Sequence, residues 1–219
     1  MPKNVKAKSD PAELRAAPRS SLVLRTAKVV CQSGEYVCLV RDVSRGGVGL
    51  RFFHAVPQEP RIFLELANGA LYPIERTWER SAADSGEAGY RFAAPVALGA
   101  FLDETSQHPH RPVRLRLKLP VLLTVDGMDC KAMLADISRC GAKLTADRRL
   151  PEGAFVRCDA LGLPLRFGHV AWRRQLEHGI TFQQAFGLEE LARCLFALQP
   201  GLEGLAEQPV TDSKAIRAA

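Results

Sequence analysis

The sequence predicts a mainly all-β protein: two tandem, small, six-stranded antiparallel β-barrels, each with a short C-terminal helix. Three observations predict this fold. The chain repeats itself, its apolar segments are short and rich in Val, Leu and Phe, and Gly, Pro and Asp separate these segments. Short strands of this number and spacing are typical of a small barrel or a barrel-like sandwich.

The internal repeat has collinear anchors of different residue types. The anchors are Asp42-Val-Ser-Arg-Gly-Gly47 with Asp136-Ile-Ser-Arg-Cys-Gly141, then Pro57 with Pro151, then Trp78 with Trp172, all 94 residues apart, and finally Gly89 with Gly179, 90 residues apart. The four lost residues fall in the polar stretch after each tryptophan. Length changes are tolerated best in surface loops, so this difference predicts a hairpin there.

Six strands are expected in each copy. In the first copy they are Leu22 to Cys31, Tyr36 to Val40, Val48 to Phe52, Ile62 to Leu66, a strand through Trp78, and Tyr90 to Phe92. In the second copy they are Leu117 to Val125, Cys130 to Ala135, Ala142 to Leu144, Phe155 to Cys158, a strand through Trp172, and Ile180 to Phe182. Gly34 and the Asp126-Gly127 pair mark the first turns, and Asp-Gly is a strong hairpin signal.

A helix candidate follows the strands of each copy. Pro95 to Asp103 is the first, and Gly187 to Leu198, with leucines at helical spacing, is the second. The predicted domains are 13–105 and 108–200, with the boundary near Ser106 to His110. We expect residues 1–12 to be a disordered basic tail and 201–219 to be a flexible tail.

Composition excludes several classes of protein. Hydrophobic residues make up 47% and charged residues 25% of the chain, as in ordinary globular proteins. No apolar run approaches the roughly 20 residues that span a bilayer, and no apolar segment follows the basic start, so we expect a cytoplasmic protein. The six cysteines show no metal-ligand spacing and are expected to be reduced and mostly buried.

The formal net charge of +6 suits an anionic partner. A nucleic-acid groove is disfavoured because the sequence has no continuous Lys/Arg block and no exposed aromatic residues between basic ones. The sequence also shows no Ser-His-Asp arrangement, P-loop, metal cluster or convincing carboxylate pair, so no enzymatic activity, metal or cofactor is expected.

Two short motifs occur together in the first copy. Arg15-Ala-Ala-Pro-Arg19 precedes the first expected strand, and the turn with Asp42, Ser44 and Gly47 follows the second. In this order and this strand pattern, each repeat resembles a PilZ domain, the bacterial receptor module for cyclic di-GMP. The resemblance extends from about Glu13 to Gln199 and implies a binding site made of these five residues.

The residue types suit the ligand that the resemblance implies. An arginine fork can meet guanine O6 and N7, stack on a base or pair with a phosphate. A carboxylate such as Asp42 can accept from guanine N1–H and N2–H, Ser44 can donate to phosphate or brace the turn, and Gly47 allows a tight bend close to the ligand. In isolation, these motifs would be read as a common turn and two solvated arginines.

The second copy departs from this pattern. Its turn retains Asp136, Ser138 and Gly141, but where Arg114 takes the place of the second arginine, the position four residues before it is His110, with Arg111 alongside. These residues form at most a weak second site, and a degenerate site with a role in docking or oligomerisation is favoured. The two repeated tryptophans are interpreted as core or barrel-rim packing rather than as base-stacking platforms.

The resemblance thus implies a cyclic di-GMP effector that couples the second messenger to a protein partner, with motility, polysaccharide or virulence as output. The alternative is a PilZ-type adaptor that binds no nucleotide, and a basic nucleic-acid-binding barrel is a third hypothesis. Retention of cyclic di-GMP in equilibrium dialysis separates the first two, and a salt-dependent gel shift would favour the third. The partner's identity and a homodimer are left open.

Overall fold

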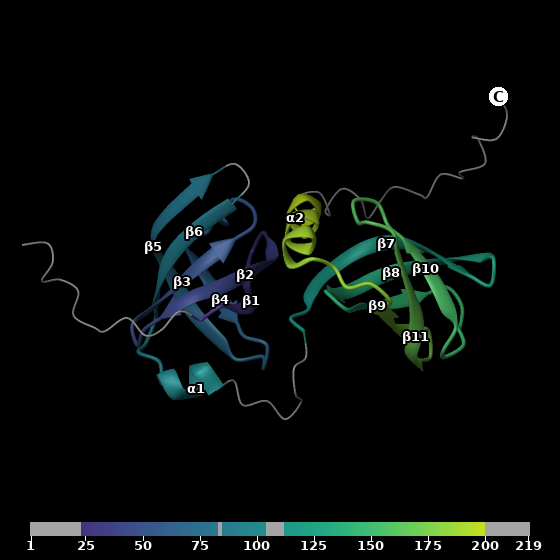
Figure 1. The fold of residues 1–219 in the computed structure, drawn as a ribbon, viewed down its shortest axis with the longest axis horizontal. Coiled ribbons are helices and arrows are strands. Elements are labelled where there is room, and N and C mark those ends of the chain that lie inside the picture. The colour runs from purple at the N-terminus through teal and green to yellow at the C-terminus, as the bar shows by residue number, and fades with distance from the viewer. Residues whose placement is uncertain (1–22, 83–84, 104–111, 200–219) are drawn as a thin grey trace, which may run out of the picture.

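The computed structural model describes residues 23–82, 85–103 and 112–199. Within these ranges the chain forms two closed six-stranded antiparallel barrels, each followed by one helix (Figure 1). The predicted fold class is therefore confirmed. The predicted tails and the boundary near Ser106 to His110 lie outside the described residues.

Both barrels have the same strand order, with the third strand next to the sixth. The first comprises β1 (Arg25–Cys31), β2 (Gly34–Val43), β3 (Gly47–Phe52), β4 (Arg61–Glu65), β5 (Leu71–Ala82) and β6 (Ser85–Phe92), followed by α1 (Leu98–Asp103). The second comprises β7 (Leu115–Val125), β8 (Met128–Ser138), β9 (Gly141–Ala146), β10 (Phe155–Asp159), β11 (Arg166–Arg174) and β12 (Glu177–Phe182), followed by α2 (Leu188–Leu198). Each expected strand and helix is present.

The hairpin inferred from the length difference is also confirmed. Strands β5 and β6 remain paired as far as Ala82 and Ser85, four residues beyond Trp78. Strands β11 and β12 end at Arg174 and Glu177, two residues beyond Trp172. The four additional residues of the first copy therefore lengthen a hairpin and leave the barrel wall unchanged.

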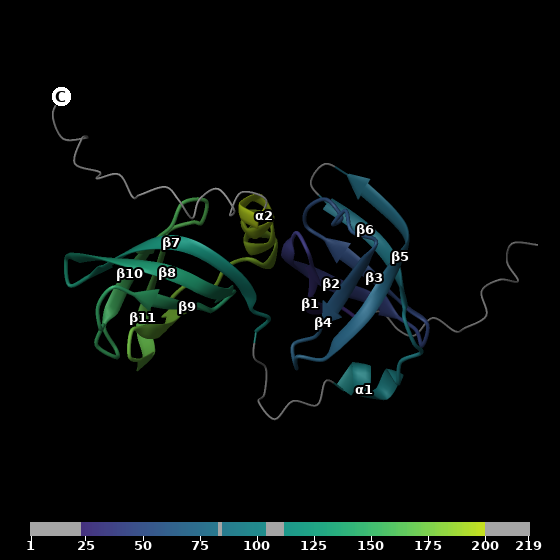
Figure 2. The ribbon, with the colours of Figure 1, turned by 180° about the vertical axis from the view of Figure 1, so that it is seen from behind.

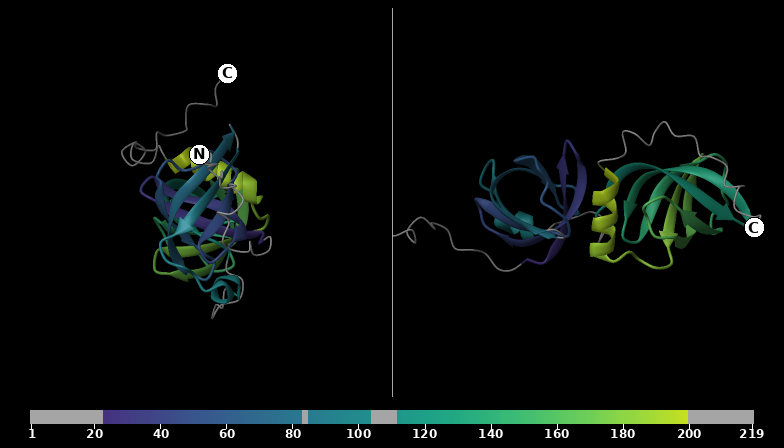
Figure 3. Two further views of the ribbon diagram at one scale, coloured as in Figure 1. Left: turned by 90° about the vertical axis from the view of Figure 1, so that its left-hand side faces the viewer. Right: turned by 90° about the horizontal axis from the view of Figure 1, so that it is seen from above.

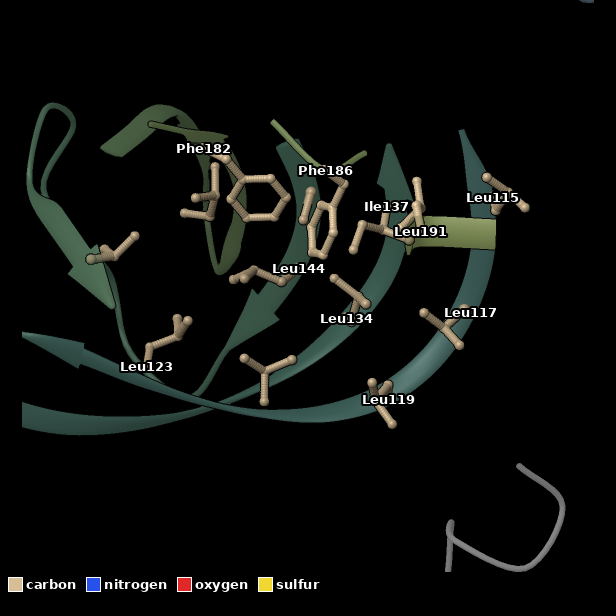
Figure 4. Packing of buried hydrophobic residues seen from close by; sticks show 14 of the residues in the cluster. Leu115, Leu117, Leu119, Leu123, Leu134, Ile137, Leu144, Phe182, Phe186 and Leu191 are labelled. Carbon is tan, nitrogen blue, oxygen red and sulfur yellow. The ribbon is translucent and has the colours of Figure 1, made fainter. Parts of the chain in front are cut away.

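Side-chain alternation explains why these segments form barrel walls. In β7, leucine and valine alternate with exposed residues, so that one face of the strand is buried along its whole length. Figure 4 shows these leucines pointing into the second barrel, where Phe182, Phe186 and Leu191 pack against them. The first barrel has its own core around Phe52, to which α1 adds Phe101.

Helix α2 lies between the two barrels (Figures 1 and 2, and Figure 3, right). Its Leu191, Leu195 and Leu198 belong to the second barrel's core. On the other side of the helix, the Phe196 ring stacks on His54 of the first barrel, with ring centroids 4.2 Å apart. The last helix of the second copy thus packs against both barrels.

A buried ion-pair network also joins the barrels. Lys28 Nζ of β1 lies 2.9 Å from the Glu35 carboxylate and donates to the Arg114 carbonyl oxygen at 2.9 Å. The Arg116 backbone N–H and guanidinium both donate to Glu35. Burial acts to raise the pKa of Glu35, but the hydrogen bonds from Arg116 and Lys28 outweigh it and hold the pKa below its usual value. Glu35 is therefore an anion bound by cations from both barrels.

Other expectations about the chain concern thiols, metals and the membrane. All six cysteines are free; Cys38 and Cys130 are buried and Cys140 is exposed. The described residues contain no cluster of three or more potential metal ligands. No helix in the described ranges has the length and apolar composition that crossing a bilayer requires.

Candidate functional site

The acidic turn between β2 and β3 is held by its own residues. The Ser44 N–H donates to the Gly47 carbonyl oxygen at 2.7 Å, and the Gly47 N–H donates to Ser44 Oγ at 3.1 Å. The carbonyl oxygen of Gly46 accepts from the N–H of Phe92 at the end of β6. Ser44 therefore braces the turn and fixes its position on the barrel, as Asx- and Ser-type turns commonly do.

Gly47 is required by a close approach of two strands. A Cβ at this position would lie 2.7 Å from the carbonyl oxygen of Tyr90 on β6. The second barrel repeats the arrangement: Ser138 Oγ donates to the Gly141 carbonyl oxygen at 3.1 Å, and a Cβ at Gly141 would collide with the Ile180 carbonyl oxygen. The turn structure alone thus accounts for both motif serines and glycines, and their ligand roles stay predictions.

Asp42 has a different environment from the rest of the turn. A β-bulge between Val40 and Asp42 directs the aspartate onto the outer face, where it pairs with Gly49 of β3. Its carboxylate lies over this glycine, with Oδ2 2.5 Å from the position that a Cβ would occupy. No described residue forms a hydrogen bond or an ion pair with the Asp42 side chain. The carboxylate is therefore available to a ligand.

Trp78 lies on the same row of residues. A bulge between Arg76 and Trp78 in β5 places the indole over Gly89 of β6, close enough to occupy the space of a Cβ. The side chain is 51% exposed and does not belong to the core, so of the two kinds of packing expected for this residue, core or barrel rim, core packing is excluded. The physical reason is that only a glycine opposite the tryptophan leaves room for the ring on the outer surface.

These four residues form one continuous row, which we call the glycine row: Asp42, Gly49, Gly89 and Trp78. Gly49 pairs directly with Gly89, and the strands β2, β3, β6 and β5 lie side by side in Figure 1. Neighbouring strands are about 5 Å apart, so the carboxylate and the indole lie over adjacent glycines. The row presents a hydrogen-bond acceptor and an aromatic surface above Gly49 and Gly89. We call these two glycines the floor of the row, because they carry no side chains.

Arginines surround the glycine row. Arg51 on β3 and Arg80 on β5 lie in the next row of residues, and Arg45 lies in the turn. All three are exposed, and none of them forms an ion pair with a described carboxylate. Arg91 on the opposite side is paired with Glu75 at 2.9 Å, and this hydrogen bond lowers the pKa of Glu75. The surroundings favour an anionic ligand.

The second barrel lacks this floor. Asp136 pairs across the strands with Lys143 in place of Gly49, and the Lys143 ammonium group lies 2.7 Å from Glu177. The Asp136 carboxylate is also engaged, because Arg114 donates to it at 3.0 Å. Trp172 still covers Gly179, and at 38% exposure it too is outside the core. In this copy, Arg114 already binds the Asp136 carboxylate, and the Lys143 side chain occupies the position of Gly49.

The arginine motifs are only partly within the described residues. Arg15, Arg19 and Arg111 lie outside them. Leu119 pairs with Leu134 in the same way as Arg25 pairs with Val40, so position 119 of the second copy corresponds to position 25 of the first. Counted back along the repeat, Arg114 corresponds to Ser20, one residue after Arg19. The Arg114 guanidinium nevertheless reaches the acidic turn of its barrel and donates to Asp136.

Sequence reasoning missed the glycine row and the lysine that interrupts it. Gly49 stands inside a predicted strand and Gly89 directly before one, and a glycine in a strand often marks a close approach of another group. That signal was present in the sequence. Which side chain approaches each glycine depends on the pairing of the strands, which includes one bulge in β2 and another in β5.

Comparisons with known proteins give structural neighbours only, because no family model and no curated protein match the chain. The chain is similar to Borreliella burgdorferi PlzA in complex with c-di-GMP, with 14% identity over 84% of this chain and 96% of that chain and a TM-score of 0.32. It is similar to Escherichia coli YcgR in complex with c-di-GMP, with 11% identity over 84% and 87% of the two chains and a TM-score of 0.30. Bacillus subtilis MotI, an inhibitor of motility, gives 8% identity over 83% and 98% and a TM-score of 0.34. Likeness at this level carries no inference about function, which has to come from the residues of the chain itself.

Proposed function

We propose that this chain is a non-enzymatic receptor for cyclic di-GMP of the PilZ type, and that the first barrel binds the nucleotide. The observation that carries the proposal is the glycine row, in which the Asp42 carboxylate has no partner among the described residues and lies over the glycine next to the one that the Trp78 indole covers. A guanine that stacks on the indole can donate its N1–H and N2–H groups to a carboxylate at the edge of the base. Arg45, Arg51 and Arg80 can then approach the phosphates.

The position of Val23, where the described chain begins, supports a role for the arginine motif at the same site. Val23 donates its N–H to the Arg41 carbonyl oxygen at 2.7 Å, directly before Asp42. Arg19 precedes Val23 by four residues, and four residues span at most about 14 Å. Arg19 is thus within reach of the glycine row, and Arg15 can follow it. The Arg114–Asp136 pair of the second copy supports this role for an arginine ahead of the first strand.

The second barrel is proposed to be a non-binding copy. Lys143 occupies the floor of its row, and Asp136 already has a cationic partner. A guanine would have to displace the Lys143 side chain and compete with Arg114 for the Asp136 carboxylate. The weak second site built on Arg111, Arg114, Asp136, Ser138 and Gly141 therefore has less support than the first site has.

Calorimetry with cyclic di-GMP on the full chain tests the proposal. We expect Asp42→Ala, Arg15→Ala and Arg19→Ala each to weaken binding by about 1.5–3 kcal/mol, as for lost hydrogen bonds to charged groups. Trp78→Ala should cost about 1–3 kcal/mol through lost stacking. The matched substitutions Asp136→Ala and Trp172→Ala in the second barrel should leave the affinity unchanged.

Two results would contradict the proposal. Wild-type affinity in all four first-barrel variants would exclude this site, and no binding by the wild-type chain would favour the adaptor that binds no nucleotide. Equal losses from the first-barrel and second-barrel variants would show that both copies bind. Melting temperatures of all variants, measured without ligand, separate loss of binding from loss of the fold.

A further inference from the structure

An exposed aromatic cluster lies on the outer face of the second barrel. Phe155 of β10 and Phe167 of β11 are 45% and 42% exposed. Their rings stack with centroids 5.8 Å apart, and His169 lies edge-on to Phe155 at 5.5 Å. We call Phe155, Phe167 and His169 the aromatic patch; the exposed Leu122 and Leu165 extend its apolar surface.

The first barrel shows that the fold does not require this patch. At the positions of Phe155 and His169, the first barrel has Arg61 and Glu75, which form an ion pair at 3.4 Å. The same barrel wall therefore tolerates solvated charges here. Aromatic side chains that are half exposed without a structural need indicate a surface that another molecule covers.

Nothing in the described part of the chain covers the aromatic patch. Strands β10 and β11 lie away from the first barrel, whereas α2 occupies the side that faces it (Figures 1 and 2). The barrel is closed, so no free strand edge is available for pairing with another chain. Association at this face has to proceed through side chains.

The charges beside the aromatic patch identify the occupant. Arg157 and Asp159 follow Phe155 on the outer face of β10, form an ion pair at 3.2 Å and are about half exposed, at 47% and 52%. This pair has no net charge, so the local charge does not favour a nucleic acid or an anionic lipid surface. An apolar centre with one positive and one negative group beside it is complementary to itself under a two-fold rotation.

We propose that the aromatic patch is the centre of a symmetric dimer interface between two copies of this chain. The two patches pack against each other, and Arg157 of each copy faces Asp159 of the other. The aromatic rings supply the buried apolar area, as at the centres of other interfaces. The proposal is independent of the ligand site, which lies on the other barrel.

Sedimentation equilibrium of the full chain without nucleotide tests this interface. We expect a concentration-dependent dimer in the wild type, and a dissociation constant raised by roughly tenfold or more in Phe155→Arg/His169→Glu, as for loss of an interface anchor. That variant introduces the pair that the first barrel already carries at these positions, so the fold should be kept. Phe63→Ser is the control, because Phe63 is an exposed aromatic residue on the corresponding strand of the first barrel.

Charge reversal distinguishes a symmetric contact from any other. Arg157→Asp alone and Asp159→Arg alone should each weaken the dimer, and mixing the two variants should restore association. A wild type that stays monomeric up to about 100 µM, a range that reveals even weak association, would overturn the proposal. So would unchanged dimerisation in the double variant, equal loss in Phe63→Ser, or failure of the mixture to associate.

Discussion

Adding one methyl group beneath Asp42, by the substitution Gly49→Ala, should weaken nucleotide binding although no charged residue is substituted. A Cβ at Gly49 would lie 2.5 Å from Oδ2 and 2.9 Å from Cγ of Asp42. Both distances are shorter than a van der Waals contact, so Gly49→Ala has to turn the carboxylate away from the glycine row. We therefore expect the loss of the hydrogen bonds that Asp42 accepts from guanine.

The magnitude follows from the kind of contact that is lost. Hydrogen bonds to charged groups contribute about 1.5–3 kcal/mol, which corresponds to a dissociation constant raised roughly 10- to 150-fold. Gly46→Ala is the matched control, because a Cβ at Gly46 has no atom within 4 Å and the residue lies in the neighbouring turn. Surface changes of this type alter free energies by less than about 0.5 kcal/mol, or roughly twofold in affinity.

Calorimetric titration of both variants with cyclic di-GMP, together with their melting temperatures, decides the question. Wild-type affinity in a folded Gly49→Ala chain would refute the reasoning, because the carboxylate would then have moved without consequence. Equal losses in Gly49→Ala and Gly46→Ala would point to a general disturbance of the turn and not to Asp42.

Further predictions concern pH and thiol chemistry. Burial lowers the pKa of His54, and a hydrogen bond to the Ala55 carbonyl opposes this only partly. The contribution of the neutral His54 to stability is therefore fully present above the ordinary pKa of 6.5 and is lost as the pH falls through the lowered pKa. His54→Phe should remove this part of the pH dependence of the melting temperature, and an unchanged pH profile would contradict the prediction. Cys140 is exposed, whereas burial raises the pKa of the Cys158 thiol to about 12 and also raises that of Cys38. Labelling of the folded chain with a thiol reagent should therefore modify Cys140 first, and faster labelling of Cys38 would show that the first barrel opens.

Local sequence patterns predicted the strands, because each strand buries one face and alternation is visible in a single segment. The shorter hairpin after Trp172 was predicted from the repeat for a similar reason: loops absorb length changes while barrel walls keep theirs. The inter-barrel network was not predicted. Lys28, Glu35 and Arg116 look like surface charges in the sequence, and the burial of Lys28 and Glu35 and their contacts with residues 114 and 116 depend on how the two barrels pack together.

The candidate site was predicted in part. Asp42 and its turn were found from the repeated motif, but its neighbour across the strand was not. Asp42 pairs with Gly49 in the register of the turn, but the bulge between Val40 and Asp42 changes the face on which Asp42 lies, so alternation from the buried Val40 does not show that the carboxylate is on the outer surface. The repeat places Lys143 at the position of Gly49, but the sequence pattern does not show that this position lies next to the aspartate and forms the floor of the site.

The position of the site along β2 makes a last prediction about signalling. Asp42 and Glu35 are at opposite ends of this strand, seven residues apart, which is about 23 Å at the usual rise. The described contacts between the barrels lie at the Glu35 end. A ligand shifts a conformational equilibrium only through contacts that differ between the two states. A nucleotide over Asp42 changes none of these inter-barrel contacts directly.

We therefore expect Glu35→Gln, which weakens the junction between the barrels, to leave the affinity for cyclic di-GMP within about twofold of the wild type, as for independent distant sites. The loss caused by Asp42→Ala should be the same in both backgrounds. Calorimetry on the two single variants and the double variant measures the interaction between them. An interaction of more than about 1 kcal/mol would mean that the junction responds to the ligand. Without it, the proposed nucleotide-binding face of the first barrel is the surface that a partner protein has to recognise.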